Sequence, residues 1–493
     1  MQTITEGHPN FKSFERELFE IMCRIACGLI QQYLAWRDLS IMGTRDKARY
    51  RHIDNNRETT IKTVFGEVSY SRRYYYDREL GRYVFLLDEA MGIFNGFGLV
   101  SENLAAQIVN ECADKSFRKA ADSVSACTGQ HISAMGAWAV AQRYANAIGE
   151  QEARLAELEE GGSVGHLGGI SSRVLQDEYD DIWINRQRER RRKPGDAAKG
   201  KKKIGKKLGK RPMHVGIAYT GWTESEGGRY STVDKIAYAS FGKAPDFRAR
   251  FEMLLNHRFD MDRVELRLTN GDGETWIRTA AEENDSILQL DPFHRSQAIT
   301  RAVIDKSDRG LLFDAIGDKD VDGLLAAICE MALDARDETE EKKLVKLHGY
   351  FNGNRDILLT FQERGIALPA PPAGIIYRCM GVQESSNCLI TQRMKRRRGS
   401  WSERGGNNMA KILCFRGTIG LDVILGALPE PKPVAEQFAE PLSAAKSPQY
   451  DGKGYGASWL HAPMPFECAF KTQGREAIRG ILRMKPVSDL SFV

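Results

Sequence analysis

The stretch SRVLQDEYDDIWINRQ, residues 172–187, decides the fold. Its β-branched and aromatic residues alternate with polar ones, and the same pattern returns in four later runs. These runs are HVGIAYTGW at 214–222, TVDKIAYASF at 232–241, RVELRLTNGDG at 263–273 and SILQLD at 286–291. A helical pattern fills residues 245–258, and a brief helix is expected between the last two runs. The order is therefore three strands in a meander, then helix, strand, helix and strand.

That order predicts an α+β or α/β domain built on a ribonuclease-H-like mixed sheet with helices. In such a sheet the first and fourth strands lie side by side. The first strand carries Glu178, Asp180 and Asp181, and the fourth ends at Asp272 between two glycines. Carboxylates on adjacent strands can bind hard cations through oxygen, and two Mg²⁺ ions about 4 Å apart can stabilise a phosphodiester displacement. We therefore expect Mg²⁺ or Mn²⁺, as a pair of ions, between an acid of the first strand and Asp272.

A third carboxylate is expected from a later helix, and the candidate is Glu384 in VQESSNCLITQRMKRRRGSW, residues 382–401. At 100° per residue, Asn387, Lys395 and Arg398 lie within about 60° of Glu384 on one helix face. Such a face would carry a metal ligand to DNA with cations on the phosphates beyond it. The predicted DNA-contacting side chains here are Arg393, Lys395 and Arg398. Taken alone, the run RMKRRR is more typical of a solvated charged face than of DNA contact.

The N-terminal region has its own pattern. Apolar residues at helical spacing predict one long amphipathic helix over residues 11–37, with core packing as the default and self-association left open by its length. The spaced residues are Phe11, Phe14, Leu18, Ile21, Met22, Ile25, Leu29, Tyr33 and Trp36. Alternation around residues 65–67 predicts a β-hairpin between about 59 and 76, where Arg72 and Arg73 could touch phosphates or lie on a half-buried sheet face.

Residues 101–148 are expected to be helical, with a helix at about 116–126, a break at Thr128 and Gly129, and a second helix capped by Ser133. Two helices joined by a short turn with glycine are typical of DNA-binding helix-turn-helix units, and also of ordinary helical packing. In the first interpretation Arg118 and Arg143 would lie near the DNA backbone.

A basic block spans residues 186–211, with fourteen Lys or Arg and two acids, which gives it a charge of +12. The rest of the chain is therefore at −7, since the whole carries 71 Lys and Arg against 66 Asp and Glu. Such a block favours contact with a polyanion over a merely solubilising loop. Lys201, Lys202 and Lys203 are its central candidates for DNA contact.

Several segments together resemble those of the ISLre-type insertion-sequence transposases, a group long catalogued as an uncharacterised protein family. The segments are FGEVSYSRRYYYD, LLDEAMGI, SFRKAA, EYDDIWI, GDGETWI, LDPFH and ESSNCLITQRMKRRRGSWSERGGNNMAKI, which lie within residues 55–425. The resemblance implies a DDE transposase, similar in outline to the Mutator-like group, with a ribonuclease-H-like core and a helical insertion between the second Asp and the Glu. It places the three carboxylates at Asp180, Asp272 and Glu384.

One departure from the family concerns the first carboxylate, because the usual Glu-Ala-Asp-Gly is replaced by Glu178-Tyr179-Asp180-Asp181. Neighbouring side chains on a strand point to opposite faces, so only one of the two aspartates can face the metals, and we favour Asp180. Related transposases place a histidine close to the scissile phosphate, which would make His294 a catalytic residue. A structural hydrogen bond between His294 and Asp291 is the alternative.

The implied organisation has four parts. Residues 1–165 form a mainly helical DNA-binding or oligomerisation region, and residues 170–295 with 376–426 form the catalytic core. Residues 296–375 form the helical insertion, and residues 427–493 form a tail without an assigned role. The implied partners are double-stranded DNA, as terminal inverted repeats and target, and further copies of the chain. The alternative is a DNA-binding protein without catalysis, either a decayed transposase or a regulator.

Composition and cysteine spacing argue against a membrane protein, a secreted protein, a disulfide framework and a zinc site. The 493 residues are 28% charged and 42% hydrophobic, and no apolar run approaches the roughly 18 residues of a membrane span. The first twenty residues lack the apolar region of a secretory signal, so we expect a cytoplasmic, nucleoid-associated prokaryotic protein without membrane contact. Nine cysteines with no CxxC pair favour reduced thiols, and Cys112, Cys127 and His131 match no standard zinc spacing.

Overall fold

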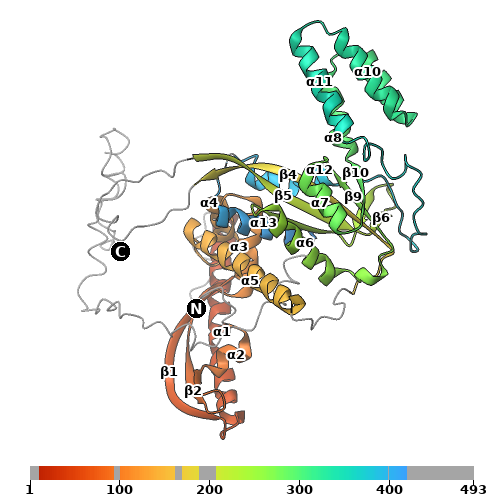
Figure 1. The fold of residues 1–493 in the computed structure, drawn as a ribbon. Helices are drawn as coiled ribbons and strands as arrows, with labels where there is room; N and C mark the ends of the chain where they lie inside the picture. The colour runs from red at the N-terminus through yellow and green to blue at the C-terminus, as the bar shows by residue number, and fades with distance from the viewer. Residues whose placement is uncertain (1–9, 94–99, 161–168, 188–206, 398, 419–493) are drawn as a thin grey trace, which may run out of the picture. The chain divides into compact units, whose positions relative to one another are not determined.

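The computed structural model describes residues 10–93, 100–160, 169–187, 207–397 and 399–418 (Figure 1). These residues all fall in one compact unit, Met1–Val434. The predicted C-terminal tail, most of the basic block with Lys201, Lys202 and Lys203, and Arg398 lie outside the described residues.

The N-terminal region consists of a long helix and a hairpin. Helix α1 (Phe11–Thr44) begins where predicted, with the Asn10 side chain accepting a hydrogen bond from Ser13 N at 3.0 Å, and it ends later than predicted. Strands β1 (Tyr50–Thr63) and β2 (Gly66–Asp77) pair antiparallel, followed by β3 (Arg82–Val84) and helix α2 (Leu86–Met91). The predicted hairpin is confirmed, although its first strand begins earlier, at Tyr50.

The apolar stripe of α1 does not pack into a core, and that expectation is wrong. Most of the predicted positions are exposed: Phe11, Leu18, Met22, Ile25, Leu29, Tyr33 and Trp36. The buried residues are Cys23, Leu34 and Asp38, on the opposite side of the helix, where Leu34 packs against Val68 and Tyr70 of the hairpin. The helix has apolar residues on two sides, and the hairpin covers one of them.

The two hairpin arginines are used inside the protein. Arg72 pairs with Asp88 of α2, and its guanidinium lies 3.7 Å from the centre of the Phe85 ring. Arg73 pairs with Asp38 of α1. The half-buried sheet face is therefore the interpretation that fits, and these cations hold the hairpin to the two helices beside it.

Three helices follow, α3 (Glu102–Asp114), α4 (Phe117–Cys127) and α5 (Ala134–Glu160). They share a core with the last described helix, α13 (Glu403–Thr418), through residues such as Ile108, Tyr144 and Ile412. The predicted cap is confirmed, because Ser133 Oγ accepts a hydrogen bond from Gly136 N at 3.0 Å at the start of α5.

The central sheet has five strands in the order β10-β9-β4-β5-β8. Their bounds are β4 Val174–Gln187, β5 Lys207–Tyr219, β8 Ile236–Ser240, β9 Leu266–Gly271 and β10 Ile287–Leu290. Strands β4, β5 and β8 pair antiparallel, whereas β9 and β10 run parallel to β4. The predicted contact of the first and fourth strands is confirmed, since Glu178 of β4 pairs with Asn270 of β9. A separate small sheet pairs β6 (Gly221–Glu224) with β7 (Tyr230–Val233).

Alternate residues of the sheet enter two different cores. Ile182 and Ile217 pack with the helical layer of α3, α5 and α13, whereas Tyr179 and Ala218 pack on the other side with α6 (Ala244–Arg258) and α7 (Thr275–Glu283). A short 3₁₀ turn (Met261–Arg263) leads from α6 to β9. The sheet is thus covered on both faces, as expected for strands with near-continuous burial.

Helices continue beyond β10, as α8 (Pro292–Ala302), α9 (Lys306–Gly317), α10 (Val321–Leu333) and α11 (Glu338–Gly353). Ile299, Leu324 and Phe351 tie them to the core of α6 and α7. Residues 354–382 hold turns but no helix or strand, and they lead to α12 (Gln383–Met394). The region predicted as a helical insertion is therefore helical up to Gly353.

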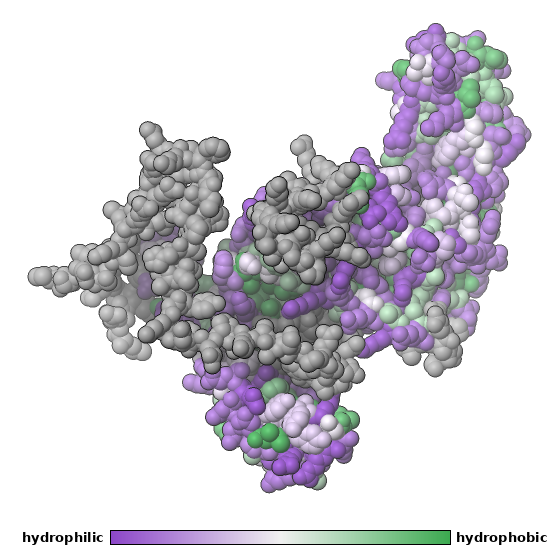
Figure 2. All heavy atoms as spheres, turned by 60° about the vertical axis from the view of Figure 1, so that its left-hand side comes forward, coloured by the Kyte–Doolittle hydropathy of each residue, from purple (hydrophilic) through white to green (hydrophobic). Residues whose placement is uncertain are grey.

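Most of the described surface in the view of Figure 2 is hydrophilic. Among the helices of the described part, none has the length and apolar character that crossing a bilayer would require.

Candidate functional site

The acids of β4 divide between the two faces of the sheet. Asp180 accepts a hydrogen bond from Asn387 of α12 at 2.6 Å, so it faces that helix. Asp181 points the other way, where its carboxylate lies 2.6 Å from His214 Nδ1 and that ring contacts Trp276. Asp177 is likewise on the far face, in an ion pair with Arg267 at 2.8 Å. Of the neighbouring aspartates, Asp180 is the one that shares its face with the helix carrying Glu384.

Asp272 follows the last residue of β9 and is held by a tight turn. Its side chain accepts a hydrogen bond from Glu274 N at 3.0 Å, and its carbonyl accepts one from Tyr350 at 2.9 Å. Gly273 has φ +85°, and a Cβ there would lie 2.1 Å from Asn354 Oδ1. The glycine after Asp272 is therefore required both by backbone conformation and by the close approach of Asn354.

Both aspartates have their pKa raised by burial and by the charge of a neighbouring acid. Burial raises the pKa of Asp180, and the charge of Asp272 raises it further, while His294 and the hydrogen bonds from Asp181 N and Asn387 lower it. Burial also raises the pKa of Asp272, and the charge of Asp181 raises it further, against a hydrogen bond from Glu274 N and the influence of His294. Both carboxylates are therefore held where their negative charge is costly without a nearby cation.

His294, on the first turn of α8, lies between two carboxylates. Its Nε2 is 4.0 Å from Asp180 Oδ1 and its Nδ1 is 3.8 Å from Asp291 Oδ2. These distances are too long for hydrogen bonds, and Nδ1 is buried with no hydrogen-bond partner in the described structure. Burial raises the pKa of Asp291 to about 6. The structural hydrogen bond between His294 and Asp291 is thus not formed: Nδ1 faces Asp291 without bonding it, and Nε2 faces Asp180.

Glu178 has a role that the sequence did not indicate. Its carboxylate is completely buried and accepts hydrogen bonds from the backbone N–H groups of Gly381, Val382 and Gln383 at 3.0–3.1 Å. Tyr219 of β5 and Asn270 of β9 donate to it as well, at 2.5 and 3.0 Å. A carboxylate at a helix N-terminus satisfies amides that have no partner within the helix. Glu178 therefore fixes the start of α12 against three strands.

Glu384 lies in the first turn of α12, directly after the amides bound by Glu178. Its side chain is exposed and makes no hydrogen bond or ion pair with the described residues. Across those residues, no three side chains of His, Cys, Asp and Glu are grouped closely enough to hold a metal ion. The structure thus brings Asp180, Asp272 and His294 into one electrostatic neighbourhood and leaves Glu384 outside it.

The donor chemistry of Asp180 and Asp272 fits a divalent cation. Their oxygens are hard ligands, and a cation would relieve the cost of two buried charges that neighbouring carboxylates repel. These two carboxylates could serve as ligands of a divalent cation, but by themselves they do not form a complete set of metal ligands.

The predicted DNA-contacting residues have different environments. Arg393 is buried, donates to Cys112 O at 2.7 Å and lies over the rings of Phe117 and Trp401, and burial lowers its pKa to about 10. It joins α12 to the helical layer, so we leave it out of any DNA-contacting set. Lys395 is exposed at the end of α12, and Arg118 and Arg143 are exposed on α4 and α5.

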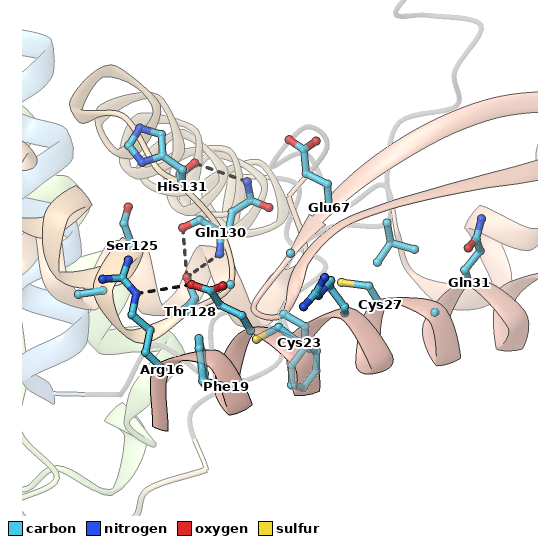
Figure 3. Close-up of a pocket in the computed structure, with 18 of the residues that line it drawn as sticks. Arg16, Phe19, Cys23, Cys27, Gln31, Glu67, Ser125, Thr128, Gln130 and His131 are labelled. Atoms are coloured by element: carbon cyan, nitrogen blue, oxygen red, sulfur yellow. Dashed lines mark hydrogen bonds and ion pairs between the residues drawn. The ribbon is translucent and has the colours of Figure 1, made fainter. Parts of the chain in front are cut away.

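The turn between α4 and α5 packs against the hairpin. Gly129 N donates to Val64 O at 3.0 Å, and a Cβ on Gly129 would lie 2.0 Å from Phe65 O. Beside this contact, α1, the hairpin turn and the α4–α5 turn enclose an open hollow of about 1400 Å³ lined by Arg16, Cys27 and His131 among others (Figure 3). The helix pair is therefore built into the N-terminal region through its turn.

Comparison with known proteins gives the following relatives. A UPF0236 protein of Caldanaerobacter subterraneus subsp. tengcongensis is 23% identical over 370 residues, covering 74% of this chain and 68% of the relative. The UPF0236 protein in the vanSb 3′ region of Streptococcus gallolyticus is 23% identical over 422 residues, covering 83% and 84%. A solved structure, the pre-cleavage Mos1 transpososome, aligns with 52% of this chain and 78% of its own at 10% identity, but its TM-score of 0.12 does not establish a shared fold. The model of the uncharacterised protein family UPF0236 matches residues 4–423, and the chain belongs to that family.

Proposed function

We propose that this protein is a DDE-type transposase that cleaves DNA at the ends of an insertion sequence and joins those ends to a target. The observation that carries the proposal is the placement of Asp180 on β4 and of Asp272 directly after the adjacent strand β9, where the charge of Asp272 adds to the electrostatic cost of ionising Asp180. The strand order and directions of the sheet are also those expected of a ribonuclease-H-like core.

In this proposal Asp180 and Asp272 hold two Mg²⁺ or Mn²⁺ ions, with Glu384 as the third ligand. Such ions would stabilise the attacking and leaving oxygens of an in-line displacement, with water and then the freed 3′-hydroxyl as nucleophiles. Asn387 orients Asp180 through its 2.6 Å hydrogen bond, and Glu178 sets the position of the helix that carries Glu384. His294 offers its Nε2 to a phosphate oxygen beside Asp180.

DNA contact is assigned to exposed cations. Lys395 extends from the end of α12, and Arg118 and Arg143 lie on the helix pair of the N-terminal region. The basic block supplies sequence-independent attraction to phosphates. The DNA substrates are the terminal inverted repeats and the target, bound by an oligomer that pairs the two ends.

The name of one relative supports the proposal that the gene belongs to a mobile element. The Caldanaerobacter protein carries eleven locus labels from a single organism. Repetition of one gene through a genome is what a mobile element produces.

The alternative is a DNA-binding protein without catalysis. Its support is the exposed Glu384, which stands apart from the two aspartates.

A cleavage assay separates the two functions. The DNA flanking the reading frame is searched for short inverted repeats, and a labelled duplex of that end is incubated with the full-length protein and Mg²⁺, Mn²⁺, Ca²⁺ or EDTA. We expect nicking with Mg²⁺ or Mn²⁺, little with Ca²⁺ because of its larger radius and looser coordination, and none in EDTA. Binding of the true end without nicking in Mg²⁺ or Mn²⁺ would establish the non-catalytic alternative.

A further inference from the structure

Helix α1 exposes a strict heptad pattern on the side away from the hairpin. One set of positions repeats every seven residues, as Phe11, Leu18, Ile25, Gln32 and Leu39. A second set of positions lies four residues after each member of the first set and consists of Glu15, Met22, Leu29, Trp36 and Gly43. All ten positions are exposed, and we call them the heptad seam. Alternating spacings of four and three give a period of 3.5, which is the period of left-handed coiled coils.

The exposed area of the seam is large for a surface without a partner. Its seven large apolar side chains are between 38% and 75% exposed, with Phe11 and Leu29 among the most exposed. A large apolar or aromatic side chain presents roughly 150–250 Å² in full, so the seam offers on the order of 700 Å² per chain. That area approaches the ~800 Å² that each partner contributes to a standard protein interface. Phe19 and Tyr33, both exposed beside the seam, widen it further.

The seam differs from the face of α1 that is already used. The packed side carries Cys23, Leu34 and Asp38, held to the hairpin by the Tyr70 cluster and by Arg73. Those residues fix the helix on its own domain. The seam can therefore accept another helix without disturbing any described contact.

We infer that the seam binds the same seam of a second copy of this chain, antiparallel, as a two-stranded coiled coil. The polar residues of the seam decide the orientation. In a parallel pair Glu15 would meet Glu15, and like charges directly opposed in a seam are unfavourable. In an antiparallel pair with a twofold axis between residues 23 and 24, Glu15 meets Gln32 of the other copy.

The same register matches the apolar positions from Phe11 to Trp36. Leu18 meets Leu29, Met22 meets Ile25, and Phe11 meets Trp36, each in both directions across the axis. Polar faces polar and apolar faces apolar along about 40 Å of helix. A twofold seam of this kind is isologous and closes with two copies. The inference uses the surface of α1 alone and does not depend on the proposed catalysis.

The first test measures mass. Light scattering of the full-length protein at micromolar concentration should give twice the chain mass of 55.4 kDa. Ile25→Asp should shift the protein to monomer, because it places two charges beside the axis. Gln31→Asp, which is exposed on the same helix but away from the seam, should remain dimeric. Ile25 is half exposed within its own chain, so the Ile25→Asp monomer should still unfold in one cooperative transition, at a lower temperature than the Gln31→Asp dimer because it lacks the stabilisation of association.

The second test measures orientation. Leu18→Cys and Leu29→Cys chains are co-expressed with different tags and mildly oxidised, with each single variant and the unmodified chain as controls. The antiparallel register predicts a disulfide between the two variants and none within either variant alone. Disulfides in the single variants would overturn the antiparallel register. Two results would overturn the seam as the interface. One is a monomeric unmodified protein, and the other is an Ile25→Asp variant that is still dimeric.

Discussion

Asp180 and Asp272 differ from Asp177 and Asp181 because no Arg, Lys or His side chain of the described residues lies within hydrogen-bond distance of either. Asp177 has Arg267, and Asp181 has His214. Acids that are already neutralised belong to the fold, whereas a pair left with raised pKa values is available for a ligand.

Asp180→Asn and Asp272→Asn should each abolish metal-dependent cleavage and leave binding of the DNA end within about twofold. The amide keeps the volume and removes the metal ligand. Because burial raises the pKa of both carboxyls, the neutral amide should not lower the melting temperature. Asp181→Asn is the control and should keep cleavage, since its carboxylate faces His214. Loss of cleavage in Asp181→Asn with full activity in Asp180→Asn would reverse the assignment.

Glu178→Gln should destabilise the protein by about 3 kcal/mol, because a buried charged acceptor of three amides is replaced by a group with one acceptor oxygen and two donors. Tyr219→Phe removes a single bond to the same carboxylate and should cost about 1 kcal/mol. Urea unfolding measures both. Hydrogen exchange should show faster amides at residues 381–383 in Glu178→Gln, and unchanged protection there would contradict the positioning role.

At this scale the sequence predicted the acids but not their partners. Glu178 and Gly381 are 203 positions apart, and Asp180 and Asn387 are 207 apart, and no local pattern reports such pairs. Arg393 illustrates the same limit. In the sequence it belongs to a charged run, but in the structure it is buried between Phe117 and Trp401.

At the scale of elements, periodicity located the strands and most helices because each has a regular apolar spacing. The order of the five strands followed from the meander and the helical crossovers. Periodicity could not tell which side of α1 would be covered, because the helix has apolar residues on two sides. The element that covers one side is the hairpin, and its packing depends on Leu34, Val68 and Tyr70 together.

The junction between the hairpin turn and the α4–α5 turn depends on one glycine. Gly129→Ala should cost a few kcal/mol, since its Cβ would overlap the Phe65 carbonyl at 2.0 Å and the backbone would have to move. Gly28→Ala, in the interior of α1 with no atom near the new Cβ, should instead stabilise by up to about 1 kcal/mol. Thermal melting should therefore move in opposite directions for the two variants. A neutral Gly129→Ala would mean that the two turns are not in contact in solution.

At the scale of the whole molecule, charge is distributed unevenly. The block at residues 186–211 carries +12, while the remainder of the chain is negative. The ends of the block pair as strands, with Arg186 opposite Gly209 and Gln187 opposite Lys207. Ten of its fourteen cations fall between these ends, in residues 188–206, so they can be removed without altering the described parts of β4 and β5.

Removing those ten cations should flatten the salt dependence of DNA binding. If the block neutralises about five phosphates, it contributes roughly −4.5 to the slope of log affinity against log salt. A deletion of residues 188–206 closed by a short Gly-Ser turn should lose that contribution, and so should a variant of full length with the ten cations changed to Gln. The Gln variant separates charge from loop length. An unchanged slope in both variants would leave the block as a solubilising loop and would assign the electrostatic attraction for DNA to the exposed cations of α4, α5 and α12.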